Sequence, residues 1–84
     1  MSGETVRVAF KAPGVDGYTE WREISLPSGA VLSDLITTLG NDISGQLNRS
    51  FIAVNDVVVR REGYSDRKLH DKDEVLLVPP LALG

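Results

Sequence analysis

Cysteine is absent from this chain, and its absence excludes several kinds of chemistry. Without a thiol there is no disulfide, no thiolate nucleophile and no thiolate metal ligand. The chain also lacks a long apolar run. Its longest uncharged apolar run, residues 75–84, is far shorter than the roughly 20 residues that span a bilayer. No signal-peptide core follows Met1, so we expect a cytoplasmic protein with no membrane partner.

The chain also lacks a large excess of charge of either sign. Nine basic side chains stand against twelve acidic ones, and a net charge of −3 argues against a protein that neutralises phosphates. We therefore expect no nucleic-acid partner. Five of the nine basic residues gather at 60–72, but five acidic residues within 60–74 balance them. The simplest interpretation is a solvated polar loop, and the alternative is a charged rim around an apolar partner surface.

The 84 residues suffice for one domain with one core and leave little room for an enclosed catalytic cavity. Apolar and polar residues alternate over 6–11, which predicts a strand that Pro13 and Gly14 end. A second strand is expected from Tyr18 to Leu26, with Ile24 and Leu26 on one face and Trp21 on the other. Trp21 is either a core-edge residue or an interface anchor.

A helical period follows at residues 31–39. Leu32, Leu35, Ile36 and Leu39 share one stripe, and Gly40 is placed to cap the carboxyl end. In the turn-rich stretch after it, Ile43 and Leu47 are expected to anchor the chain to the core.

The second half of the chain predicts three more strands. They are expected at 51–54, 57–59 and 74–78, with a turn at Asn55-Asp56 and a core anchor at Leu69. A hairpin, one helix and further strands indicate an α+β fold of the β-grasp type, a mixed sheet packed on one main helix. A small open barrel is the alternative.

The end of the chain is unusually apolar. Chain ends commonly carry polar residues, yet residues 75–84 hold no charged side chain. Pro79 and Pro80 cannot continue a central strand and favour an extended conformation. We therefore expect residues 1–80 to form the domain and 81–84 to project as a tail. Leu81 and Leu83 either pack back on the sheet or enter a groove on a partner protein.

The sequence resembles the ubiquitin-like sulfur carriers, closest to the small subunit of molybdopterin synthase and more distantly to the thiamine sulfur carrier. The resemblance is carried by residues 6–10, 29–36 and 53–55, and most specifically by residues 69–80, which read Leu-His-Asp-Lys-Asp-Glu-Val-Leu-Leu-Val-Pro-Pro. It covers nearly the whole chain. The Pro-Pro pair favours the molybdopterin branch.

The resemblance implies a carrier with no catalytic side chains of its own and no bound cofactor. A separate E1-like enzyme would use ATP to adenylate the carboxylate of Gly84, which would then become a thiocarboxylate. The sulfur would be donated inside a partner such as the molybdopterin synthase large subunit. The residues implied in partner binding are those of the tail: Pro79, Pro80, Leu81, Ala82, Leu83 and Gly84.

Two positions depart from the family pattern. Leu83 stands where the family has a penultimate glycine, and a branched side chain there adds thickness to the tail. The partner then has a roomier channel, or the chain is a protein modifier or a binding module without sulfur transfer. Lys72 replaces the glycine of an acidic turn, a mild change provided that the backbone there avoids positive φ.

His70 is the one histidine, and it adjoins Asp71, Asp73 and Glu74. These residues lack the spacing of metal ligands and do not form a calcium-loop pattern. We expect a solvated turn, no metal site and no enzymatic acid–base group.

Overall fold

The computed structural model describes residues 4–43, 45 and 50–78 of the chain. The elements, in chain order, are β1 (Thr5–Lys11), β2 (Arg22–Pro27), α1 (Leu32–Leu39), the 3₁₀ turn η1 (Gly40–Asp42), β3 (Phe51–Val54), β4 (Val57–Val59), the 3₁₀ turn η2 (Arg61–Gly63) and β5 (Glu74–Val78). Each predicted strand and the predicted helix has a counterpart among them. Leu47, the second predicted anchor of the crossover, lies outside the described residues.

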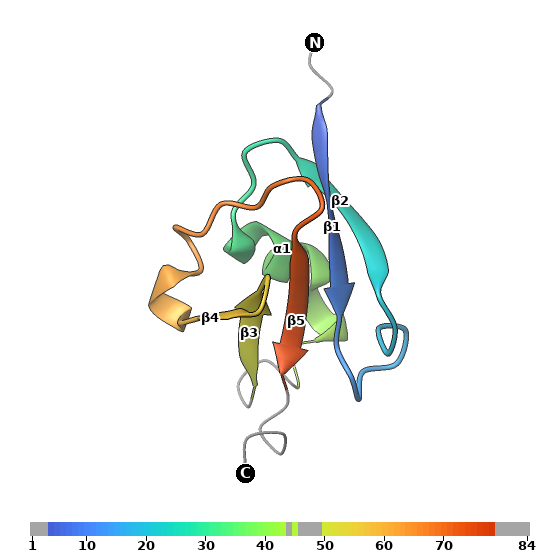
Figure 1. Cartoon of the computed structure of the whole chain (residues 1–84). Helices are drawn as coiled ribbons and strands as arrows, with labels where there is room; N and C mark the ends of the chain where they lie inside the picture. Colours follow the sequence, from blue (N-terminus) through green and yellow to red (C-terminus); the bar gives the residue numbers. More distant parts are fainter. Residues whose placement is uncertain (1–3, 44, 46–49, 79–84) are drawn as a thin grey trace.

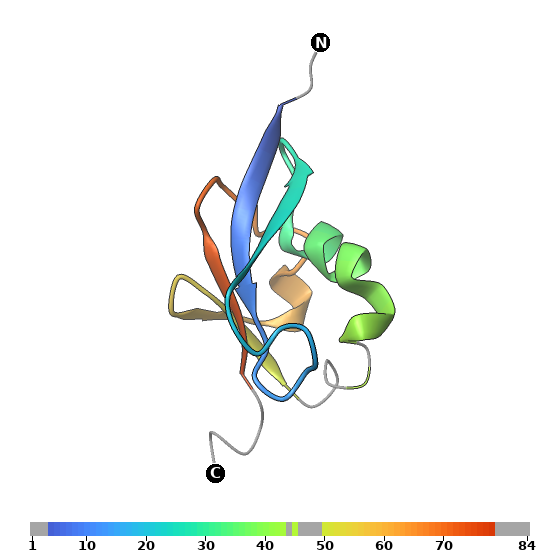
Figure 2. The same cartoon turned by 90° about the vertical axis from the view of Figure 1, so that its right-hand side faces the viewer.

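The strands form one open sheet in the order β2-β1-β5-β3-β4 (Figure 1). The central pair, β1 and β5, is parallel, and the other pairs are antiparallel. Helix α1 lies against one face of this sheet, as the turned view shows (Figure 2). The mixed sheet packed on α1 confirms the β-grasp prediction. The sheet is open, with β2 and β4 at its two edges, so the alternative of a small barrel is wrong.

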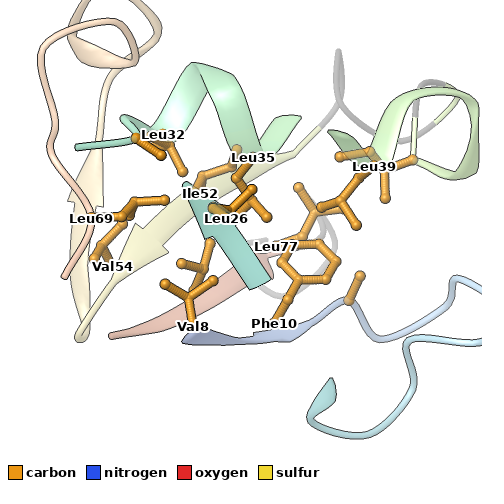
Figure 3. Close-up of a cluster of buried hydrophobic side chains, with 14 of the residues drawn as sticks. Val8, Phe10, Leu26, Leu32, Leu35, Leu39, Ile52, Val54, Leu69 and Leu77 are labelled. Atoms are coloured by element: carbon orange, nitrogen blue, oxygen red, sulfur yellow. The ribbon is translucent and has the colours of Figure 1, made fainter. Parts of the chain in front are cut away.

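The core lies between α1 and the sheet (Figure 3). Leu32, Leu35 and Leu39 point from the helix toward Phe10 and Ile52 on the strands, and all five are buried. The helical stripe and the period-2 strand pattern therefore predicted the two surfaces that meet. Two further anchors predicted from the sequence are also buried, namely Ile43 and Leu69.

Both ends of α1 follow local chemistry. Asp34 accepts a hydrogen bond from the Val31 N–H at 2.9 Å, which satisfies one donor at the amino end. Gly40 adopts a φ of 52° at the carboxyl end and donates its N–H to the Ile36 carbonyl. The glycine cap predicted from the sequence is thus confirmed, and the helix begins one residue later than expected, since Val31 is its N-cap.

The prediction that the second strand begins at Tyr18 is wrong, because pairing with β1 begins at Arg22. Pro13 has no N–H for a ladder bond, and the chain leaves β1 in a loop closed by the Ala12 N–H on the Tyr18 carbonyl, at 2.7 Å. The Tyr18 hydroxyl donates to Asp42 Oδ2 at 2.8 Å, and this bond raises the pKa of Tyr18. Tyr18 therefore ties the loop to η1 instead of extending the sheet.

Two turns hold non-glycine residues at positive φ. Asn55 and Asp56 have φ values of 52° and 71°, the type I′ geometry of a two-residue hairpin, so the turn predicted there is confirmed. Lys72 has a φ of 72°. The condition under which the replacement of glycine by Lys72 is mild, a backbone that avoids positive φ, is therefore not met. Its N–H bonds to the Arg7 carbonyl at 2.7 Å, which holds the turn in this conformation beside β1.

Replacing Lys72 with glycine is expected to stabilise the fold by about 1 kcal/mol, because a side chain at positive φ costs roughly that amount. The melting temperature should rise by about 5 °C. Lys68 provides the matched control, since it lies in an isolated β-bridge with Val31 and not at positive φ. Lys68→Gly should lower the melting temperature, and a loss of stability in Lys72→Gly would contradict the strain argument.

Candidate functional site

The predicted functional residues, Pro79 to Gly84, lie outside the described residues. The structure does describe where the chain enters that segment. Strand β5 ends at Val78, in register with Phe51 at the start of β3. The surface that surrounds this end of the sheet is therefore the part of the candidate site that lies within the described residues.

The outer face of the sheet, turned away from α1, carries an apolar patch over β3, β4 and β5. Alternate residues of these strands, such as Ile52, belong to the core, so their neighbours point outward. We call five of these outward residues the outer-face patch: Phe51, Ala53, Val58, Leu76 and Val78.

Register brings the patch together from three strands. Ala53 lies between Val58 on β4 and Leu76 on β5, and Phe51 lies beside Val78. Phe51 is 47% exposed and Val58 is 57% exposed, whereas Ala53 is almost covered. Exposed large apolar side chains grouped on one face are typical of protein–protein contact sites.

The other half of the outer face, over β1 and β2, is charged. Ala9 lies in register between Glu23 and Glu74 and forms part of the floor of a shallow hollow of about 450 Å³. Trp21 also lines the hollow; it is 46% exposed, and Lys11 Nζ lies 5.7 Å from its ring centroid. Trp21 is thus a surface residue and not part of the core. That it anchors an interface remains a prediction.

The acidic turn near His70 is structural rather than simply solvated. The His70 side chain is exposed, as expected, but Asp73 is buried. The Asp73 carboxylate accepts bonds from the His70 N–H at 2.8 Å and from Asn55 Nδ2 at 3.0 Å. Asp71 accepts a bond from the Arg7 N–H at 2.9 Å. These two carboxylates fasten the turn before β5 to β1 and to the β3–β4 hairpin.

Neither a metal centre nor a membrane span emerges from the part of the chain that the structure covers. Its histidine and acidic side chains form no group of three placed to hold a metal ion. None of its helices has the length and apolar character to cross a membrane.

Sequence reasoning predicted docking through an apolar face of the sheet but did not name the residues of the outer-face patch. The signal that could have found it is the composition of two strands, since residues 51–54 and 75–78 are apolar at every position. Such a strand buries or presents apolar side chains on both faces. Helix α1 covers one face of the sheet, and over these strands the opposite face is apolar as well.

The mixed sheet packed on α1 is the β-grasp fold of the ubiquitin-like class. Residues 15–82 match the model of the ThiS family, and the chain belongs to that family. The resemblance to the ubiquitin-like sulfur carriers is thereby confirmed, and family and fold together support a carrier role. No curated protein matches the sequence closely enough to serve as a relative.

Solved structures share the fold at low sequence identity. The HVO 2177 protein of Haloferax volcanii has a TM-score of 0.77 at 18% identity, over 100% of this chain and 92% of that one. A chain in the complex of subunits 1 and 2 of the molybdopterin-converting factor of Helicobacter pylori scores 0.63 at 22%, over 89% and 95%. A ubiquitin-like protein of Trypanosoma brucei scores 0.64 at 13%, over 93% and 98%.

Proposed function

We propose that this protein is a sulfur carrier for molybdopterin synthesis, with the carboxylate of Gly84 as the group that carries sulfur. The main support for the proposal is the match to the ThiS family model. The match covers residues 15–82 and therefore includes part of the apolar tail. A structural neighbour that is part of a two-subunit molybdopterin-converting factor supports the molybdopterin branch. The Pro79-Pro80 pair in the sequence supports the same branch.

Activation needs chemistry that the carrier itself does not supply. A carboxylate is a poor electrophile, so one oxygen of the Gly84 carboxylate attacks the α-phosphorus of ATP on an E1-like enzyme and pyrophosphate leaves. Hydrosulfide from the sulfur donor then attacks the carbonyl carbon, the carbon–sulfur bond forms, AMP leaves, and loss of a proton gives the thiocarboxylate. We infer a cytoplasmic setting for these steps, since they consume ATP.

The outer-face patch is the surface that we assign to holding the activating enzyme and the sulfur-accepting partner. It adjoins the end of β5, so an enzyme seated on Phe51 and Val78 would lie at the point where the tail begins. Exposed apolar side chains on the face opposite α1 supply binding energy there, and the tail supplies the reacting group. In this carrier the outer-face patch at the end of β5 serves recognition, and the tail that follows β5 carries the reacting group.

Intact mass spectrometry tests the proposal. The protein is incubated with ATP, a sulfur donor and an E1-like enzyme shown to activate its own carrier. The expected product is the chain with one oxygen replaced by sulfur, located at Gly84 by fragmentation. A chain lacking Gly84 should keep its melting temperature and show no exchange. A wild-type mass that stays unchanged with an active enzyme would contradict the proposal.

Leu83 offers a second arm of the same experiment. A leucine next to the reacting residue adds bulk that a narrow channel excludes, so Leu83→Gly should raise the rate of activation by an enzyme adapted to a slim tail. Leu81→Gly is the matched control, because it removes the same side chain two residues earlier. A product in which Gly84 is joined to a lysine, with no sulfur-bearing chain, would show a protein modifier instead.

A further inference from the structure

The two edges of the sheet are built differently. Edge strand β2 carries Arg22, Glu23 and Pro27, and charges and proline discourage pairing with other strands. Edge strand β4 is Val57-Val58-Val59, with no charge and no proline. Val57 is 64% exposed and Val58 57%. Strand β4 is therefore the unguarded edge of this sheet (Figure 1).

Hydrogen-bond direction along β3 shows which groups of β4 are available. The Asn55 N–H donates to the Glu74 carbonyl on β5 at 2.8 Å, so the backbone groups of the preceding residue, Val54, point to the other side, toward Val57. That is the bonded pair that closes a two-residue hairpin. In an antiparallel ladder the next pair is not bonded, so the N–H and C=O of Val58 point away from β3.

The residues around Val58 form a self-complementary sequence. From Asp56 to Arg60 the chain reads Asp-Val-Val-Val-Arg, and Arg60 keeps an extended backbone with φ −77° and ψ 158°. An antiparallel copy centred on Val58 would face each acidic end with a basic end. A two-fold interface repeats every contact, so one favourable pair of charges becomes two.

We propose that β4 pairs antiparallel with β4 of a second copy of this chain, about a two-fold axis at Val58. Val58 then faces Val58 of the second copy, and the outward N–H and C=O of each satisfy those of the other. Val57 faces Val59 of the second copy. Asp56 faces Arg60 of the second copy at both ends of the pairing. The two sheets join into one through the two β4 strands.

The dimer is weak and concentration-dependent. Three residues a side bury much less than the roughly 1,200 Å² of a standard stable interface. Cross-strand pairs of β-branched residues and opposite charges contribute a few tenths of a kcal/mol to about 1 kcal/mol each. The pairing goes beyond the proposed carrier function and does not rest on it, because it uses the sheet edge and neither the tail nor its activation.

A concentration series of the full chain tests the pairing, by sedimentation and by the amide NMR signals of isotopically labelled protein. The amides of Val58 and Arg60 should shift with concentration as the dimer forms. Val58→Lys places two like charges at the axis and should raise the dissociation constant about tenfold or more. Ser25→Lys adds the same charge at the exposed Ser25 of the guarded edge and should leave the constant unchanged.

A charge exchange separates this register from any other contact. Asp56→Lys and Arg60→Glu should each associate more weakly than the wild type, since each places like charges at both ends. A mixture of the two variants should associate as the wild type does, because both opposite pairs are restored. A wild type that stays monomeric to millimolar concentration, or a mixture no tighter than its components, would overturn the proposal.

Discussion

Replacing Asp73 with alanine is expected to lower the free energy of unfolding by about 3 kcal/mol. Asp73 is buried, and its carboxylate accepts bonds from the His70 N–H and from Asn55 Nδ2. A hydrogen bond to a charged group is worth about 1.5–3 kcal/mol, and the two donors left behind lose their partner. For a domain of this size the melting temperature should fall by about 15 °C.

Two control variants define the cause. Asp73→Asn keeps an acceptor oxygen for one of the two donors, so roughly half of the loss should return. Asp66→Ala makes the same substitution at the exposed Asp66, where a change within about 0.5 kcal/mol is expected. An Asp73→Ala protein that melts with the wild type would show that the carboxylate does not fasten the turn.

The hydrogen bonds of Asp73 show a structural role for part of the two stretches that carry the family resemblance, residues 53–55 and 69–80. Asn55 donates to Asp73 through Nδ2 and accepts the Glu74 N–H at 2.9 Å through Oδ1. One amide side chain thus joins the β3–β4 turn to the start of β5. These residues therefore position β5, whose end leads into the tail. The resemblance around Asn55 and Asp73 therefore reflects the fold, and the reaction that we propose uses the tail.

Local periodicity predicted the elements because each is encoded by its own residues. The stripe of Leu32, Leu35 and Leu39 gives a helix with one buried face, and the alternation around Val8 and Phe10 gives a strand. Asn55-Asp56 signals a tight turn through residue types that tolerate positive φ. None of these inferences needs knowledge of which segments meet in space.

Contacts between distant segments could not be predicted in the same way. The partners of Asp73 include Asn55, 18 residues earlier, and a local pattern of acidic residues resembles a solvated turn. The late start of β2 depends on Tyr18 bonding to Asp42 across 24 residues. Sheet order likewise decides that Val58, Ala53 and Leu76 share one row. These sites depend on the tertiary arrangement of distant segments, which local sequence patterns do not reveal.

Replacing Phe51 with glutamate is expected to lower the rate of activation by an E1-like enzyme by about 30-fold or more, with the fold intact. Phe51 is 47% exposed and lies beside Val78, where the proposed interface meets the tail. An aromatic anchor at the centre of an interface contributes about 2 kcal/mol or more, which corresponds to this factor. ATP–pyrophosphate exchange at varied carrier concentration measures the effect, which should fall mainly on the concentration needed for half-maximal rate.

Val57→Glu is the matched control for that substitution. Val57 is also exposed, at 64%, and an acidic group there adds the same charge to the neighbouring strand, outside the outer-face patch. Its activation should remain within about threefold of the wild type, because a charge at the exposed rim of an interface contributes little to the binding energy. Equal losses in both variants would assign the effect to net charge, whereas no loss in either would place recognition away from the outer face. A loss confined to Phe51→Glu identifies a contact through the apolar surface, since the tail is the same in both proteins.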